Sequence, residues 1–129
     1  MEENKVFEND FMRLESKNGI LYGTYKSDVV DLELAKKIVE IRLNFIQGKE
    51  VPMIFKQDGL KAINKEARTY LNSDIGIKGV SAGAIVANSA FQAHLANFFI
   101  KITTNKPKIP AKVFKEESEA LEWLEQFKN

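Results

Sequence analysis

The stretch VSAGAIV, residues 80–86, combines β-branched side chains with alanine and glycine and lacks the polar–apolar alternation of a half-exposed strand. A second stretch, VPMIF at residues 51–55, is also apolar throughout. Runs of this kind are typical of strands that are covered on both faces, as in parallel sheets. The small side chains in the first stretch would allow helices to pack close to it. Together the two stretches predict the centre of a parallel sheet.

Turn residues and helical periodicity place further elements around this centre. Asn18-Gly19 suits a two-residue type I′ turn between the strands Phe11–Glu15 and Ile20–Tyr25. Apolar residues at three- and four-residue spacing predict a helix that Asp28 or Asp31 caps and that Gly48 ends in the left-handed conformation. The remaining predicted elements are helices at 64–72, at 89–103 and around 120–127, and a strand at Ala111–Phe114.

The predicted order of elements is ββαβαβαβα, in a single domain that spans residues 1–129 and begins with a flexible N-terminal segment at residues 1–10. Strands that alternate with helices need crossover connections, which are right-handed in nearly all cases, so the strands after the hairpin run parallel. We therefore expect an α/β fold. Its mixed sheet has about five strands, antiparallel in the N-terminal hairpin and parallel elsewhere, with about four helices.

Composition argues against several classes of function. The 129 residues include no cysteine and one histidine, which removes thiolate nucleophiles, disulfide scaffolds and thiolate zinc sites. A net charge of +1 provides no strong field that would attract nucleic acid. No apolar run approaches the roughly 20 residues of a membrane span, and the first residues lack the apolar region of a signal peptide. We expect a cytoplasmic protein without a metal, a cofactor or a nucleic-acid partner.

The candidate catalytic motifs have simpler structural interpretations. The glycines of GIKGVSAG, residues 76–83, match neither the dinucleotide nor the Walker pattern, and they precede a strand where those motifs follow one. Ser89 is predicted to cap a helix, with Gln92 completing a capping box. His94 lies beside the core stripe of that helix without an orienting partner nearby in sequence. We therefore expect a protein that is not an enzyme.

The helix predicted after Ser89 carries apolar residues on two faces. Ala93, Ala96 and Ile100 lie opposite its phenylalanine-rich core stripe, and only a narrow polar wedge separates the two faces. Burial against the protein's own chain, a contact with a second copy and a hydrophobic ligand all remain open interpretations of this second face.

The ends of the predicted parallel strands supply the other candidate binding residues. Asp58 follows one strand, and Asn88 and Ser89 follow the next. Open α/β sheets bind ligands at the carboxyl ends of their strands, so these side chains belong to the favoured edge. If the protein were an enzyme, its reactive residues would come from the same edge, which also holds Ser27.

Four parts of the sequence carry a family resemblance: KEARTY at residues 65–70, AIVANS at 84–89 followed by NFF at 97–99, AKVF at 111–114, and EALEWL at 119–124. They resemble the STAS domain, the fold of bacterial anti-sigma-factor antagonists, and are more closely similar to its small stand-alone STAS/SEC14-type relatives in bacteria. The resemblance covers the chain from about Phe11 onward and rests mainly on structural residues. It implies a domain that acts through a partner protein.

Sigma-regulating members of the STAS family are switched by phosphorylation of a serine or threonine where the central strand leads into the second helix. Here that connection is QDGLKAIN, residues 57–64, in which Asp58 matches the acidic member of the motif and no hydroxyl is present. A phosphate therefore has no acceptor at this place. The resemblance predicts a non-catalytic protein-binding or regulatory module, with a homodimer as one form of partner. Its alternative is a SEC14-like carrier or sensor of a small hydrophobic or lipid ligand, associated with a membrane surface.

Overall fold

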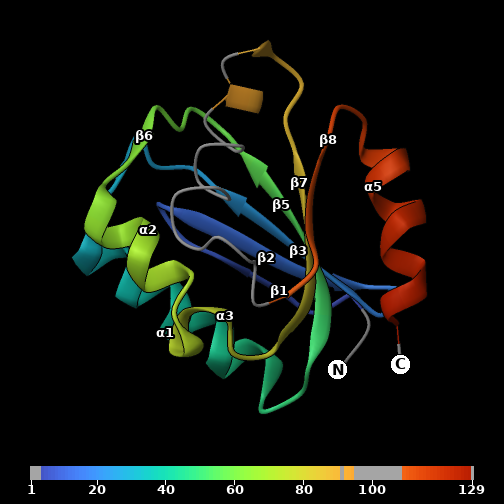
Figure 1. Ribbon diagram of the computed structural model, residues 1–129. Coiled ribbons are helices and arrows are strands. Elements are labelled where there is room, and N and C mark those ends of the chain that lie inside the picture. Colours follow the sequence, from blue (N-terminus) through green and yellow to red (C-terminus); the bar gives the residue numbers. More distant parts are fainter. Residues whose placement is uncertain (1–3, 91, 95–108, 129) are drawn as a thin grey trace.

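Figure 1 shows a computed structural model of the protein, in which residues 4–90, 92–94 and 109–128 are described. The strands of its main sheet are β1 (Val6–Glu8), β2 (Met12–Lys17), β3 (Ile20–Tyr25), β5 (Val51–Gln57), β7 (Val80–Val86) and β8 (Ala111–Phe114). Their spatial order is β1-β2-β3-β5-β7-β8. The pairs β1–β2 and β2–β3 are antiparallel, and β3, β5, β7 and β8 run parallel to one another. The predicted mixed α/β sheet is confirmed.

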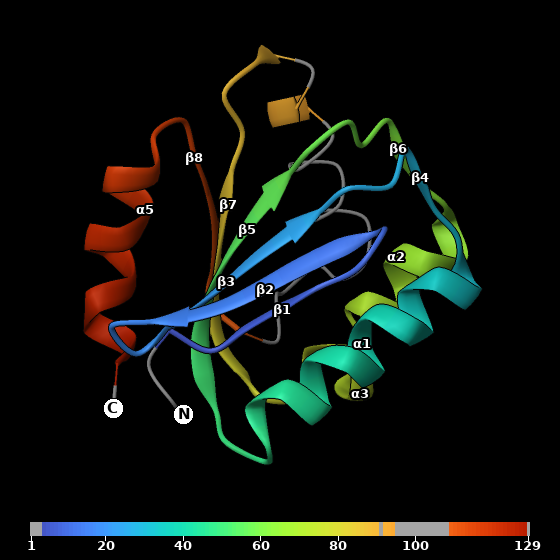
Figure 2. The same cartoon turned by 180° about the vertical axis from the view of Figure 1, so that it is seen from behind.

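Helices cover the sheet on both faces (Figures 1 and 2). The described helices are α1 (Leu32–Ile46), α2 (Lys65–Leu71), α3 (Asp74–Ile77) and α5 (Glu117–Leu124), which a short 3₁₀ turn (Glu125–Phe127) extends. The first three lie on one face and α5 on the other. In β5, Met53 packs into the larger core under α1, whereas the adjacent Ile54 packs with Leu124 of α5. Burial on both faces explains why this strand is apolar at successive positions.

The type I′ turn and the left-handed end of α1 both appear in the structure. Asn18 and Gly19 have φ angles of 53° and 76°, and the antiparallel register pairs Lys17 with Ile20 on either side of them. At the end of α1 the left-handed conformation begins one residue earlier than predicted. Gln47 is the C-cap at φ 52° and donates its backbone N–H to the Leu43 carbonyl, and Gly48 follows at φ 78°.

Several short elements were not predicted. β1 lies within the segment that we expected outside the elements, where the Asn9 side-chain oxygen accepts hydrogen bonds from the N–H groups of Phe11 and Met12 and turns the chain into β2. A separate two-stranded parallel sheet joins β4 (Val29–Val30) to β6 (Ala62–Ile63). The one-turn helix α3 is also additional. Strands of two or three residues are too short to show a periodicity in the sequence.

The start of the helix predicted after β7 lies within the described residues. The Ser89 hydroxyl oxygen accepts from the Gln92 N–H at 3.1 Å, and the Gln92 side-chain oxygen accepts from the Asn88 N–H at 3.1 Å. This arrangement differs from the usual capping box, in which the second bond returns to the cap residue itself. The predicted core stripe and the apolar positions 96 and 100 lie outside the described residues.

A buried arginine connects α1 to the segment before β7. Arg42 is only 2% exposed, and its Nη2 donates to the carbonyls of Gly76, at 2.7 Å, and Lys78, at 3.1 Å. Its Nε has no hydrogen-bond partner among the described residues. Burial lowers the pKa of this guanidinium, and nearby Tyr25 and Tyr70 act in the opposite direction. Arg42 thus provides donors for carbonyls at the end of α3 that the short helix leaves unpaired.

The N-cap of α1 allows a direct stability test. The Asp31 side chain accepts from the Leu34 N–H at 2.8 Å, which selects Asp31 over Asp28 as the capping residue. Asp31→Ala is expected to lower the free energy of unfolding by about 1 kcal/mol, because the helix loses this bond. Asp28→Ala is the control, because Asp28 accepts hydrogen bonds from the N–H groups of Lys61 and Ala62 through its backbone carbonyl, which the substitution keeps. Equal urea midpoints for the two variants would contradict this assignment.

Candidate functional site

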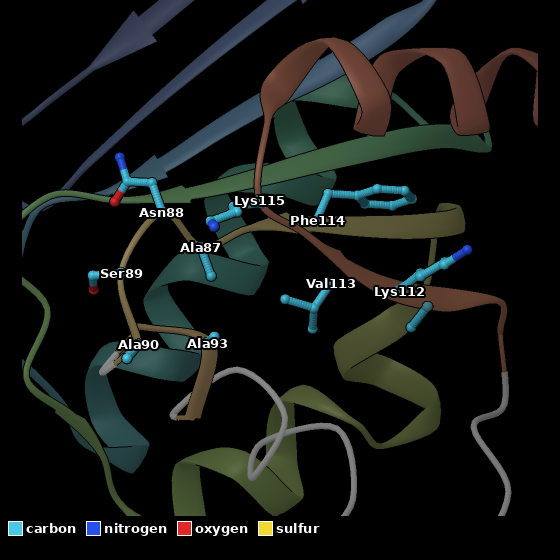
Figure 3. A pocket seen from close by; sticks show the side chains of 10 residues that line it. Ala87, Asn88, Ser89, Ala90, Ala93, Lys112, Val113, Phe114 and Lys115 are labelled. Atoms are coloured by element: carbon cyan, nitrogen blue, oxygen red, sulfur yellow. The ribbon is translucent and has the colours of Figure 1, made fainter.

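An open cavity of about 800 Å³ lies at the carboxyl ends of β7 and β8 (Figure 3). Its lining consists mostly of small apolar residues with a few polar ones: Ala87, Asn88, Ser89, Ala90, Ala93, Ala111, Lys112, Val113, Phe114 and Lys115. Cavities that hold small molecules are typically roughly 300–1,000 Å³ in volume and largely apolar. The volume of the cavity falls in this range, and the cavity lies at the edge of the sheet where open α/β folds bind ligands.

The pairing of β7 with β8 determines which side chains face the cavity. In the parallel register Ile85 lies opposite Val113, and the Ala87 N–H donates to the Phe114 carbonyl at 2.8 Å. Successive side chains of a strand point to opposite faces. Phe114 packs with Trp123 of α5, with ring centroids 5.6 Å apart, so Val113 points to the other face (Figure 3).

Alanines at the end of β7 and in the first helical turn after it leave room for the cavity. Ala87 is buried, Ala93 is half-buried and Ala90 is exposed. The Ala93 N–H donates to the Ser89 carbonyl at 2.9 Å, which fixes the first turn of the helix. Because alanine ends at Cβ, these residues contribute apolar surface and occupy little volume.

The polar part of the lining is basic and neutral. Asn88, Ser89 and the two lysines are all exposed, and none of the ten lining residues is acidic. The Ser89 hydroxyl accepts the capping hydrogen bond, and His94 is exposed and is not among the lining residues. Within this lining, no serine is paired with a histidine or a carboxylate as nucleophilic catalysis requires.

The structure brings together three of the six predicted binding residues. Asn88, Ser89 and Ala93 line the cavity. Asp58 does not; it is exposed after β5, and its N–H donates to the Tyr25 carbonyl at 2.8 Å. Ala96 and Ile100 lie outside the described residues. Ser27, the further candidate in the case of an enzyme, is half-buried after β3 and is also absent from the lining.

Sequence reasoning missed the contribution of β8 to the cavity. All five residues from Ala111 to Lys115 line the cavity, and the first four form a strand that was correctly predicted. The strand was visible in the sequence, but its neighbour in the sheet and the register between the two strands were not. A prediction of the order of strands in the sheet would have been needed to find them.

A family of domains of unknown function, DUF7793, matches residues 12–128 of the sequence. The chain belongs to this family. No curated protein matches the DUF7793 chain. Among solved structures, an uncharacterised protein of the DUF3478 family from Shewanella loihica PV-4, described as having a SpoIIAA-like fold, is similar to it. The two are 17% identical with a TM-score of 0.58, and the alignment covers 96% of the DUF7793 chain and 98% of the other. The resemblance to the STAS fold is confirmed by this likeness.

Residues 57–64 form the connection that corresponds to the phosphorylated one in sigma-regulating STAS proteins. In the DUF7793 chain, backbone hydrogen bonds join this connection to the loop after β3. The N–H groups of Lys61 and Ala62 both donate to the Asp28 carbonyl, at 2.6 and 3.1 Å, where β6 pairs with β4. In the described part of the chain, no group of three or more histidine, aspartate or glutamate residues could hold a metal ion. No described helix is long and apolar enough to cross a membrane.

Proposed function

We propose that this protein is a non-catalytic binding module with a STAS-like fold, and that it binds a small molecule with an apolar body in the cavity between Ser89 and β8. The observation that supports the proposal is the cavity itself, where six of the ten lining residues are alanine, valine or phenylalanine. Its position at the carboxyl ends of parallel strands agrees with the general location of ligand sites in open α/β sheets.

The chemistry of the lining favours binding over catalysis. The Ser89 hydroxyl caps a helix, and the other polar side chains of the cavity are an amide and two ammonium groups. These groups can orient a ligand by hydrogen bonding and charge, and the described lining residues include no general base beside a nucleophile.

A protein partner, including a second copy of the chain, is the second candidate occupant. It is favoured by the position of β8, which is the last strand of the described sheet and borders the cavity. A segment of a partner can add to such an edge and place an apolar side chain in an adjacent pocket. Phosphorylation in the connection after β5 is not part of this proposal, because that segment has no hydroxyl side chain.

Filling the cavity tests the proposal. Val113 lines the cavity on the edge strand β8, and Val6 lies 47% exposed on the opposite edge strand β1. We expect wild type and Val6→Trp to bind the uncharged apolar probe N-phenyl-1-naphthylamine saturably, measured by probe fluorescence. Val113→Trp is expected to bind it about tenfold more weakly or not at all, because the indole occupies the space that the probe needs.

Circular dichroism and thermal unfolding would show that both tryptophan variants are folded. Equal affinity of Val113→Trp and Val6→Trp would contradict the cavity as the binding site. If the probe does not bind wild type, and sedimentation velocity instead shows a self-association that Val113→Trp abolishes, the small-molecule proposal is wrong and the second candidate replaces it.

A further inference from the structure

Among the described residues of the cavity lining, lysines provide all the charge. Lys112 and Lys115 are the charged members among the ten lining residues. The nearest acidic residues in sequence, Glu116 and Glu117, are not in the lining, and the Glu117 carboxylate forms an ion pair with Lys56 of β5. A ligand in the cavity therefore meets positive charge at its rim.

The two lysines lie at different places along β8. Lys112 is within the strand and shares the α5 face with Phe114, and its Nζ lies 5.4 Å from the centroid of the Phe114 ring. Lys115 comes directly after Phe114, the last residue of the strand. The Ala87–Phe114 hydrogen bond places Lys115 at the end of β7, and Figure 3 shows it beside Ala87 and Asn88.

The lining combines apolar surface with positive charge. Lys115 and Asn88 lie where β7 and β8 end, and Ala93 and Val113 provide apolar lining (Figure 3). A ligand that matches this lining has an apolar body and a group with negative charge. Such complementarity of charge mainly determines which ligands are accepted and contributes modestly to affinity where the charge is exposed.

We propose that the cavity accepts a small amphiphile with one anionic group, such as a medium-chain carboxylate, and that Lys115 is the residue that selects the anion. In this arrangement the ammonium group of Lys115 contacts the anionic group, and the apolar body lies against Val113 and Ala93. This inference rests on the proposed function and adds the charge of the ligand to it.

The test compares decanoate with the uncharged decanol on three proteins: wild type, Lys115→Met and Lys17→Met. Isothermal titration with monomeric ligand, below its aggregation concentration, gives the dissociation constants. We expect Lys115→Met to weaken the binding of decanoate about fivefold and to change the binding of decanol by less than about twofold. Lys17→Met is the control, because Lys17 at the end of β2 is exposed and is not among the lining residues, and it is expected to retain the wild-type affinity for decanoate. Added salt should reduce the difference between wild type and Lys115→Met, because the rim is exposed.

The outcomes separate the two proposals. If decanol binds and decanoate binds equally to wild type and Lys115→Met, the anionic ligand is ruled out and the proposed function remains. If neither ligand nor N-phenyl-1-naphthylamine binds wild type, the proposed function fails as well. If the protein binds vesicles of phosphatidylglycerol but shows no saturable binding of decanoate, the protein recognises an anionic membrane surface, and the inference of a cavity ligand is overturned.

Discussion

Gly76→Ala is expected to lower the free energy of unfolding by about 3 kcal/mol, because an added Cβ has no space at this position. That atom would lie 2.1 Å from the carbonyl oxygen of Tyr70 and 2.5 Å from that of Leu71. Both are backbone atoms, so the clash cannot be relieved by rotating a side chain. The end of α2 and the start of α3 would have to move apart, and urea denaturation would measure the cost.

Gly48→Ala is the control, because it also replaces a glycine by alanine but introduces no steric clash. Gly48 has a φ of 78°, and an added Cβ there would meet no atom within 4 Å. The expected cost is about 1 kcal/mol, from the left-handed backbone alone. If Gly76→Ala unfolds at the same urea concentration as Gly48→Ala, the close approach of α2 and α3 is not a feature of the folded protein.

Arg42→Ala is also expected to lower the free energy of unfolding by about 3 kcal/mol. The substitution leaves a void in the core between α1 and α3 and removes the donors to the carbonyls of Gly76 and Lys78. A buried carbonyl without a donor is costly because folding has removed the water that would otherwise bind it. Urea denaturation, with near-ultraviolet circular dichroism as a check on packing, would measure this loss.

Arg42→Met separates the two causes of that loss. Methionine fills most of the space without a donor or a charge, and burying a guanidinium is itself unfavourable, as its lowered pKa shows. We therefore expect Arg42→Met to lose about half as much stability as Arg42→Ala. If Arg42→Met is as unstable as Arg42→Ala, the lost hydrogen bonds account for most of the loss of stability. If Arg42→Ala is as stable as wild type, Arg42 does not connect α1 to α3.

The central strands could be predicted because their physical signal is local. The strand at Val80–Val86 and the strand at Ala111–Phe114 have the predicted ends, and the apolar run from Val51 is extended to Gln57. Burial on both faces leaves an apolar run in the sequence, and a type I′ turn requires residues such as Asn18 that tolerate positive φ. These signals come from residues that are close together in the sequence, so one sequence is enough to detect them.

The cavity could not be predicted in full because it depends on contacts between distant segments. Asn88 and Ser89 were found from their place after a strand, but Val113 and Lys115 reach the same cavity only through the register of β7 and β8. The role of Arg42 could not be predicted for a similar reason. Arg42 is buried in α1, but its acceptors are backbone carbonyls more than 30 residues away in sequence, which the periodicity of its own helix does not reveal.

The short ladder between β4 and β6 has a mechanical consequence. It joins the loop that leaves β3 to the loop that leaves β5, and the Asp58 N–H adds a further bond to the Tyr25 carbonyl. Because these bonds couple the two loops, we expect the connection after β5 to move with the loop after β3 and to act as a brace and not as a hinge. The coupled strand ends are those of β3 and β5, and β5 pairs directly with β7, so the proposed cavity at the ends of β7 and β8 adjoins the braced centre of the sheet.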